Sequence, residues 1–101
     1  RLLHRRAVRT VRQDPSSILD WGISREPFLD KAPGDALASA SWSMTGPDNA
    51  LTLANEDVQG TDAVVWISGG TVGATYTVTC HVVTVNGRED DASFRMRIEH
   101  T

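Results

Sequence analysis

The feature that most constrains the fold is a strict alternation of apolar and polar residues in two neighbouring segments near the C-terminus. The odd positions of these segments are mostly threonine, serine, arginine or histidine. Successive residues of a strand face opposite sides, so each segment predicts a β-strand with one buried and one exposed face. The apolar residues occupy the even positions of both segments, namely Tyr76, Val78, Cys80, Val82, Ala92, Phe94, Met96 and Ile98.

The two segments are joined by Asn86-Gly87, a dipeptide typical of β-hairpins. Residues directly opposite each other in a hairpin face the same side of the sheet. A two-residue loop would place Val78 opposite Arg95 and mix the two faces. A three-residue loop with Gly87 in the left-handed conformation places Val78 opposite Phe94. The pattern therefore predicts the longer, bulged turn.

Similar alternation and turn residues occur along the rest of the chain. Helix-period stretches are scarce, which favours an all-β domain. We expect a two-sheet antiparallel sandwich of about six or seven strands, without a helix longer than about two turns. The further strands are expected at residues 19–24, 37–44, 51–53, 61–68 and 74–85, with connections at 25–35, 46–49, 55–60 and 69–73.

The three tryptophans lie on different expected strands. Trp42 shares its face with alanines and Met44 and is expected in the core, whereas for Trp21 and Trp66 both burial and an exposed aromatic contact remain open. Residues 64–67 are apolar on both faces, so the strand is either buried on both sides or offers one face to a partner. The residues expected in the core are Trp42, Tyr76, Val78, Cys80, Val82, Phe94, Met96 and Ile98.

Charge divides the chain into a basic N-terminal arm, residues 1–13, and an acidic sandwich, residues 14–101. The arm has five arginines and no acid and carries +5, while the remaining five basic and thirteen acidic residues give −8. We expect an arm that is disordered alone or ordered by a partner, and an acidic protein neighbour is favoured over nucleic acid. The expected partner-binding residues are Arg1, Leu2, Leu3, Arg5, Arg6, Val8, Arg9, Arg12, Trp66 and Ile67.

The sequence shows neither a catalytic arrangement nor a cofactor motif, so we expect no enzyme activity, no metal and no cofactor. Cys80 and His81 are adjacent on an expected strand and face opposite sides, which excludes joint binding of one metal ion. The run Glu89-Asp90-Asp91 matches no calcium-loop spacing and is interpreted as solvated charge at an edge. A single cysteine excludes an internal disulfide and fits a reducing compartment.

Two strings, VVWISGGTVGATYTVT and TVNGREDDASFRMRI, resemble small proteins of tailed phages described as fibre-tail adaptor or neck-region proteins with an immunoglobulin-like fold. Asp14-Pro15, Leu19-Asp20-Trp21 and Ser41-Trp42 fit the earlier part of that pattern, so the resemblance covers about residues 14–99. It implies a structural component of the virion, made in the host cytoplasm and present in several copies. The implied partners are other virion proteins of the neck, tail or fibres. The basic arm departs from the pattern.

Two other interpretations remain open at this stage. An exposed tryptophan would also suit a module that binds carbohydrate or a cell surface, and the arginines would also suit nucleic acid. The sequence contains no apolar run near 18 residues, so we expect no transmembrane helix. The basic first residues are not followed by an apolar stretch, so we expect no signal peptide. Since the chain begins with Arg1, either upstream residues are absent from it or the end was processed.

Overall fold

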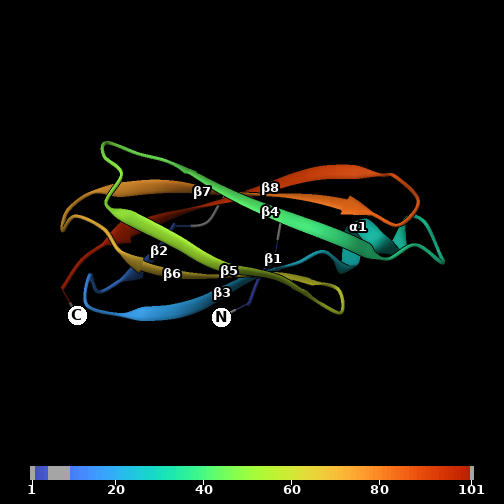
Figure 1. Ribbon diagram of the computed structural model, residues 1–101, viewed down its shortest axis with the longest axis horizontal. Helices are drawn as coiled ribbons and strands as arrows, with labels where there is room; N and C mark the ends of the chain where they lie inside the picture. Colours follow the sequence, from blue (N-terminus) through green and yellow to red (C-terminus); the bar gives the residue numbers. More distant parts are fainter. Residues whose placement is uncertain (1, 5–9, 101) are drawn as a thin grey trace.

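The computed structural model describes residues 2–4 and 10–100, which form two four-stranded sheets packed face to face (Figure 1). Within these residues the chain has eight strands and one short helix. Their bounds are β1 Leu2–His4, β2 Thr10–Gln13, β3 Ile18–Ser24, α1 Glu26–Asp30, β4 Leu37–Thr45, β5 Leu51–Gln59, β6 Asp62–Gly69, β7 Thr75–Thr84 and β8 Glu89–Ile98. The expected all-β, immunoglobulin-like antiparallel sandwich is confirmed.

The strand order is β1-β3-β6-β5 in the first sheet and β2-β8-β7-β4 in the second. The N-terminal segment gives one short strand to each sheet, with β1 parallel to β3 and β2 parallel to β8. All other neighbouring strands are antiparallel. Each sheet therefore has a short parallel edge strand on one side and a nine-residue strand, β4 or β5, on the other.

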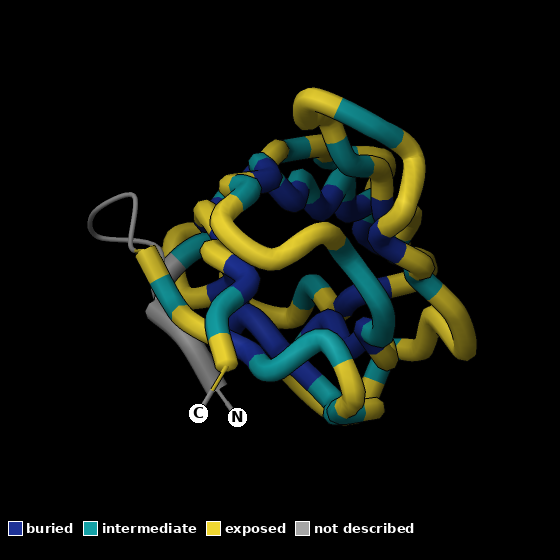
Figure 2. The backbone as a smooth tube through the Cα atoms, turned by 90° about the vertical axis from the view of Figure 1, so that its left-hand side faces the viewer, coloured by how far each residue is buried: buried dark blue, intermediate teal, exposed yellow. Residues whose placement is uncertain are grey.

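The core lies between the two sheets, where buried residues of both layers face each other (Figure 2). Phe94 lies at its centre, with ring centroids 5.9 Å from Trp21 and 6.3 Å from Trp42. Trp21 is also buried. Of the two tryptophans for which burial or exposure was left open, Trp21 therefore belongs to the core. All eight residues expected in the core are buried, namely Trp42, Tyr76, Val78, Cys80, Val82, Phe94, Met96 and Ile98.

The β7–β8 hairpin has the predicted bulged turn. The backbone N–H of Thr84 donates to the carbonyl of Arg88 at 2.8 Å, and Gly87 has a φ of 84°. Val78 lies opposite Phe94, as the hydrophobic register requires. A left-handed residue in this turn keeps the apolar face of both strands on the core side.

Three local features differ from the sequence-based expectations. The polar segment after Leu53 continues as strand β5, because a register shift between Ala54 and Asp57 absorbs the irregular residues. The connection after β3 contains the five-residue helix α1. Asp90 is not solvated edge charge. It forms an ion pair with the guanidinium of Arg25, which is buried.

The N-terminal strand β2 lies against β8 and ends in a buried residue. The side-chain Nε2 of Gln13 donates to the carbonyl of Ile67 at 2.8 Å, and its Oε1 accepts from the indole Nε1 of Trp21 at 2.6 Å. In this structure Thr10–Gln13 is therefore an edge strand of the second sheet. The division into an arm of residues 1–13 and a sandwich of residues 14–101 stays a prediction about what is separable in solution.

Candidate docking surfaces

The outer face of the first sheet carries an exposed aromatic residue, Trp66 of β6. Trp66 lies opposite Asp20 of β3 and Ala54 of β5, and 40% of it is exposed. Ile18 lies on the same face, diagonal to Trp66, and is 68% exposed. A tryptophan and an isoleucine together on an open sheet face form the kind of apolar contact that protein partners use.

Ile67, which we expected on the same surface, lies on the other side of the strand. Adjacent strand residues point to opposite faces, and the register places Ile67 opposite Leu19 and Leu53 toward the core. Its side chain is completely buried. Of the two residues predicted in β6, Trp66 alone is available to a partner in this structure.

Most of the arginines expected to bind a partner lie outside the described residues. Leu2 and Leu3 belong to β1. Arg12 is exposed on β2, and its Nε lies 3.5 Å from the carboxylate of Glu99. The structure brings neither Arg12 nor β1 next to Trp66, because β2 belongs to the opposite sheet and β1 is separated from β6 by β3. The residues outside the description are Arg1, Arg5, Arg6, Val8 and Arg9.

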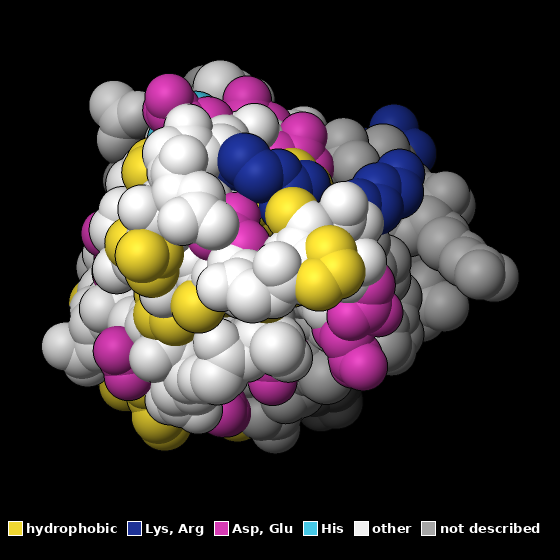
Figure 3. Space-filling model, turned by 90° about the vertical axis from the view of Figure 1, so that its right-hand side faces the viewer, with side chains coloured by type: hydrophobic (Ala, Val, Ile, Leu, Met, Phe, Trp, Pro, Cys, Tyr) yellow, Lys and Arg dark blue, Asp and Glu magenta, His cyan; other side chains and the backbone are white. Residues whose placement is uncertain are grey.

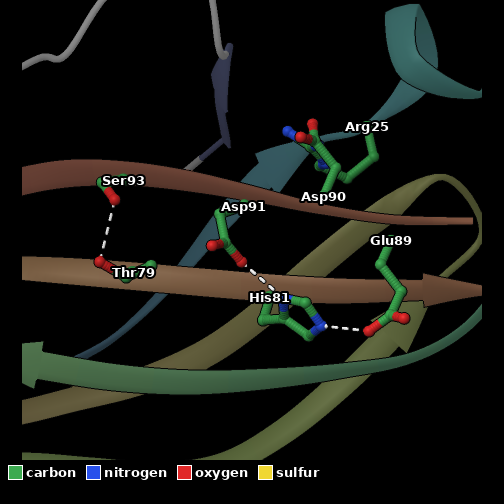
Figure 4. A network of polar contacts seen from close by, with 7 residues as sticks. All are labelled: Arg25, Thr79, His81, Glu89, Asp90, Asp91 and Ser93. Carbon is green, nitrogen blue, oxygen red and sulfur yellow. Dashed lines mark hydrogen bonds and ion pairs between the residues drawn. The ribbon is translucent and has the colours of Figure 1, made fainter.

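A polar network lies on the outer face of β7 and β8 (Figure 4). The His81 ring contacts the Asp91 carboxylate through Nδ1 at 2.5 Å and the Glu89 carboxylate through Nε2 at 2.8 Å. Hydrogen bonds to Asp91 and then Glu89 raise the pKa of His81 above its ordinary value. The hydroxyls of Thr79 and Ser93 join the two strands further along. The ring thus lies between two carboxylates.

Arg25, between β3 and α1, is a buried cation that the sequence reasoning missed. Its Nη2 contacts the Asp90 carboxylate at 2.5 Å, while Nε and Nη1 are buried without a hydrogen-bond partner among the described residues. The guanidinium carbons of Arg25 and Arg88 lie over the ring of Phe28, 5.2 Å and 4.1 Å from its centroid. These cation–π contacts fix α1 to the hairpin end of the sandwich.

The end of the molecule that holds α1 shows basic, acidic and apolar side chains mixed over its surface (Figure 3). The apolar side chains there are scattered among polar groups. Single exposed apolar residues are normal on protein surfaces, so this end is a weaker docking candidate than the sheet face at Trp66.

The turn before β5 is held by a second network. The hydroxyl of Tyr76 donates to Asp48 at 2.6 Å and accepts from the backbone N–H of Thr71 at 3.0 Å. The bond from Tyr76 is the main reason that the pKa of Asp48 is lowered. Gly46 packs against the same ring, since an added Cβ would lie 2.4 Å from Tyr76. This arrangement is structural and ties two loops to the core.

The described residues offer little for chemistry. None of their His, Cys, Asp and Glu side chains form a group that could hold a metal ion. Burial raises the pKa of the Cys80 thiol to about 12, which keeps it uncharged and unreactive at neutral pH. Within residues 2–4 and 10–100 we find no helix long and apolar enough to cross a membrane.

Comparison with known proteins identifies the family. Residues 13–97 match the family described as Podophage GP4 fiber-tail adaptor protein gp77, and the chain belongs to this family. It is therefore a phage tail adaptor with a β-sandwich fold, a structural component of the virion and not an enzyme. An adaptor between fibre and tail binds other virion proteins. The resemblance inferred from the sequence is confirmed.

One solved structure extends the comparison of the fold. The crystal structure of the cysteine protease inhibitor EhICP2 from Entamoeba histolytica has 12% sequence identity and a TM-score of 0.54. The similarity covers 97% of this chain and 93% of that chain. At this identity the likeness concerns the fold alone. A search of curated proteins gives no match.

Proposed function

We propose that this protein joins the neck or tail of a podophage to its fibres by protein–protein docking, in several copies arranged symmetrically. The observation that carries the proposal is the exposed Trp66 beside Ile18 on the outer face of the first sheet, in a chain of the fibre-tail adaptor family. Tryptophan at the centre of an interface often dominates its binding energy, because its large surface leaves water on binding.

The arginines of residues 1–13 are the second proposed contact. They carry +5 and the rest of the chain carries −8, so this segment complements an acidic neighbour, including the sandwich of an adjacent copy. Each exposed ion pair contributes about 0–1 kcal/mol, so several arginines must act together. Within the chain, Arg12 already lies 3.5 Å from the carboxylate of Glu99, a contact of the kind proposed between copies.

Incorporation into particles tests both contacts. Trp66→Ser should lower the amount of protein in purified virions by at least about tenfold, while its melting temperature stays close to that of wild type. Val85→Ser is the matched control, because Val85 is an exposed apolar residue in the β7–β8 turn. Normal incorporation of Trp66→Ser would overturn the role of this face.

A second variant replaces the arginines at positions 1, 5, 6, 9 and 12 with serine. It keeps the chain length and removes the +5 charge of the segment. We expect loss of incorporation at low salt and a smaller difference from the wild type in high salt, because screening weakens the ion pairs that the wild-type arginines make. If the variant enters particles at the normal copy number, docking relies on the sandwich itself.

A further inference from the structure

The strand β4 ends the second sheet, and no described strand pairs with its outer edge. It is nine residues long and contains neither a charged residue nor a proline. Its register shift lies at the very start, between Leu37 and Ser39, so the ladder from Ser39 to Thr45 is regular. Soluble proteins usually protect such edges with charges, prolines or bulges in the middle of the strand.

The neighbouring edge strand β5 carries that protection and β4 does not. In β5 the register shifts between Ala54 and Asp57, and Asn55 has a φ of 53°. Two carboxylates, Glu56 and Asp57, follow at the same place. On the far side of the sandwich, the edge strands β1 and β2 have three and four residues. Among the described edges, β4 is thus the long and regular one.

One outward backbone group of β4 is already occupied. The N–H of Trp42 donates to the side-chain Oε1 of Glu56 at 3.1 Å. Backbone groups of alternate residues point to the same side of a strand, so the N–H groups of Ala40 and Met44 also face outward. The carboxylate of Glu56 therefore takes the place that the carbonyl of an added strand would fill. The neighbouring side chains on the exposed face are small, being Ser39, Ser41 and Ser43.

We propose that β4 accepts an extended segment of another virion protein as an added strand, and that a lysine or arginine of this segment takes over the Glu56 carboxylate. This inference rests on the proposed docking function and deepens it. When the segment arrives, its carbonyl replaces Glu56 at the Trp42 N–H, so the donor stays paired. The released carboxylate is exposed and can form an ion pair with a cation of the segment, and this pairing favours a segment with a central lysine or arginine.

A second copy of β4 is a poorer occupant. Antiparallel pairing of two β4 strands about Trp42 would bring the Glu56 carboxylates of both copies together, and like charges facing each other across strands are destabilising. Each copy also carries −8 over residues 14–101. An extended segment with a central cation meets neither penalty.

Hydrogen exchange measures this contact directly in the unmodified protein. We expect the Ala40 and Met44 amides to exchange at least about tenfold more slowly in purified virions than in the free protein. In the free protein, the Trp42 amide should already be protected by Glu56. Equal exchange of residues 40–44 in both states would overturn the inference.

Variants distinguish a partner strand that pairs with the backbone of β4 from a partner that only covers this edge. Ala40→Pro removes an outward donor and should lower incorporation at least about tenfold, whereas Ala40→Ser keeps the N–H and should incorporate normally. Glu56→Lys should lower incorporation because it repels the incoming cation. Asp57→Lys is the control for Glu56→Lys, because it makes the same change of charge at a residue that does not contact the N–H of Trp42. Normal incorporation of Ala40→Pro or Glu56→Lys would contradict the inference.

The outcomes also distinguish this inference from the proposed function. If Ala40→Pro fails to fold, the Glu56→Lys variant and the exchange measurement decide whether a strand is added to β4. If Trp66→Ser loses incorporation while both edge variants enter particles normally, docking at the sheet face stands and strand addition fails. Absence of the wild-type chain from virions would overturn the proposed function itself.

Discussion

At the scale of single residues, the sequence identifies core residues well where the alternation is strict. Tyr76, Val78 and Phe94 are fully buried as expected, because hydrophobic periodicity reports directly on which face of a strand meets the core. Trp66 and Ile67 show the limit of the method. Their strand is apolar on both faces, so the pattern alone does not show which side meets the opposite sheet.

The first prediction concerns Phe94, which contacts both Trp21 and Trp42. Phe94→Ala should lower the free energy of unfolding by about 3–5 kcal/mol, because it removes a large buried ring and leaves a cavity. Chemical unfolding measures the loss, and Val85→Ala, at an exposed position, should change it by less than about 0.5 kcal/mol. A loss below about 1 kcal/mol for Phe94→Ala would contradict the central position of this ring.

The second prediction compares two neighbouring acids of β8. Asp90 pairs with the buried Arg25, whereas Asp91 contacts His81 on the surface. Asp90→Ala should lower the free energy of unfolding by about 3 kcal/mol, because it leaves a buried cation without its counter-charge. Asp91→Ala, which removes an exposed pair, should cost no more than about 1 kcal/mol at neutral pH. Equal losses in urea unfolding would show that Arg25 does not depend on Asp90.

At the scale of elements, strand positions follow from alternation and turn residues, and four elements escape this reasoning. The strand β5 continues through residues that look polar because Asn55 adopts a positive φ at its bulge. The helix α1 has five residues, too short to show a helical period. Strands β1 and β2 are short edge strands that pair in parallel with distant segments, so their place is set by tertiary contacts.

The same strands also position groups that no sequence pattern marks as a site. Glu56 reaches Trp42 of the neighbouring sheet from fourteen residues away, across the open side of the sandwich. Gln13 links β2 of the second sheet to the first sheet, through Trp21 of β3 and Ile67 of β6. Both contacts join residues of different strands, so local periodicity holds no trace of them. The sequence of this chain does show one weaker sign of the β4 edge, which is that the strand contains neither a charged residue nor a proline.

The third prediction concerns the contact between β7 and β8 at His81. Hydrogen bonds to Asp91 and Glu89 raise its folded-state pKa above the ordinary histidine value of 6.5. The raised pKa means that the folded state binds the proton more tightly than the unfolded state. This contribution to stability is complete below pH 6.5 and disappears as the pH rises through the raised pKa.

Urea unfolding across this pH window measures the effect, and His81→Gln should flatten the dependence. Asp91→Asn should reduce the pKa shift more than Glu89→Gln, because the bond to Asp91 is the larger cause. An NMR titration of the His81 ring gives the pKa in each variant. The arrangement in Figure 4 would be contradicted if the pKa of the His81 ring were not raised. It would also be contradicted if His81 made the stability rise with pH in this window.

At the scale of the whole molecule, the outer faces of the two sheets differ in character. The first sheet exposes Trp66 and Ile18, whereas the outer face of the second sheet carries the polar network around His81. On one side both sheets end in short strands of the N-terminal segment, and on the other side β4 is open. The functional class followed from family resemblance, because the physical pattern alone extends no further than a β-sandwich without catalytic groups.

The last prediction decides where the body of the molecule begins. The separable arm inferred from charge requires that removal of residues 1–13 leave stability nearly unchanged. The contacts of Gln13 predict a different result, because its loss leaves the buried indole of Trp21 and the carbonyl of Ile67 without this partner. A chain beginning at Asp14 should therefore be less stable than one beginning at Thr10 by about 2–4 kcal/mol.

Chemical unfolding of the two shortened chains and the full chain makes the comparison, and Gln13→Ala in the full chain is the control for the side chain alone. If Gln13→Ala reproduces most of the difference, its hydrogen bonds are the cause and the sandwich begins at β2. If the chain from Asp14 is as stable as the full chain, the boundary lies after residue 13 and the charged arm is separable. In that case any loss of incorporation on removing the arm reports on docking and not on folding.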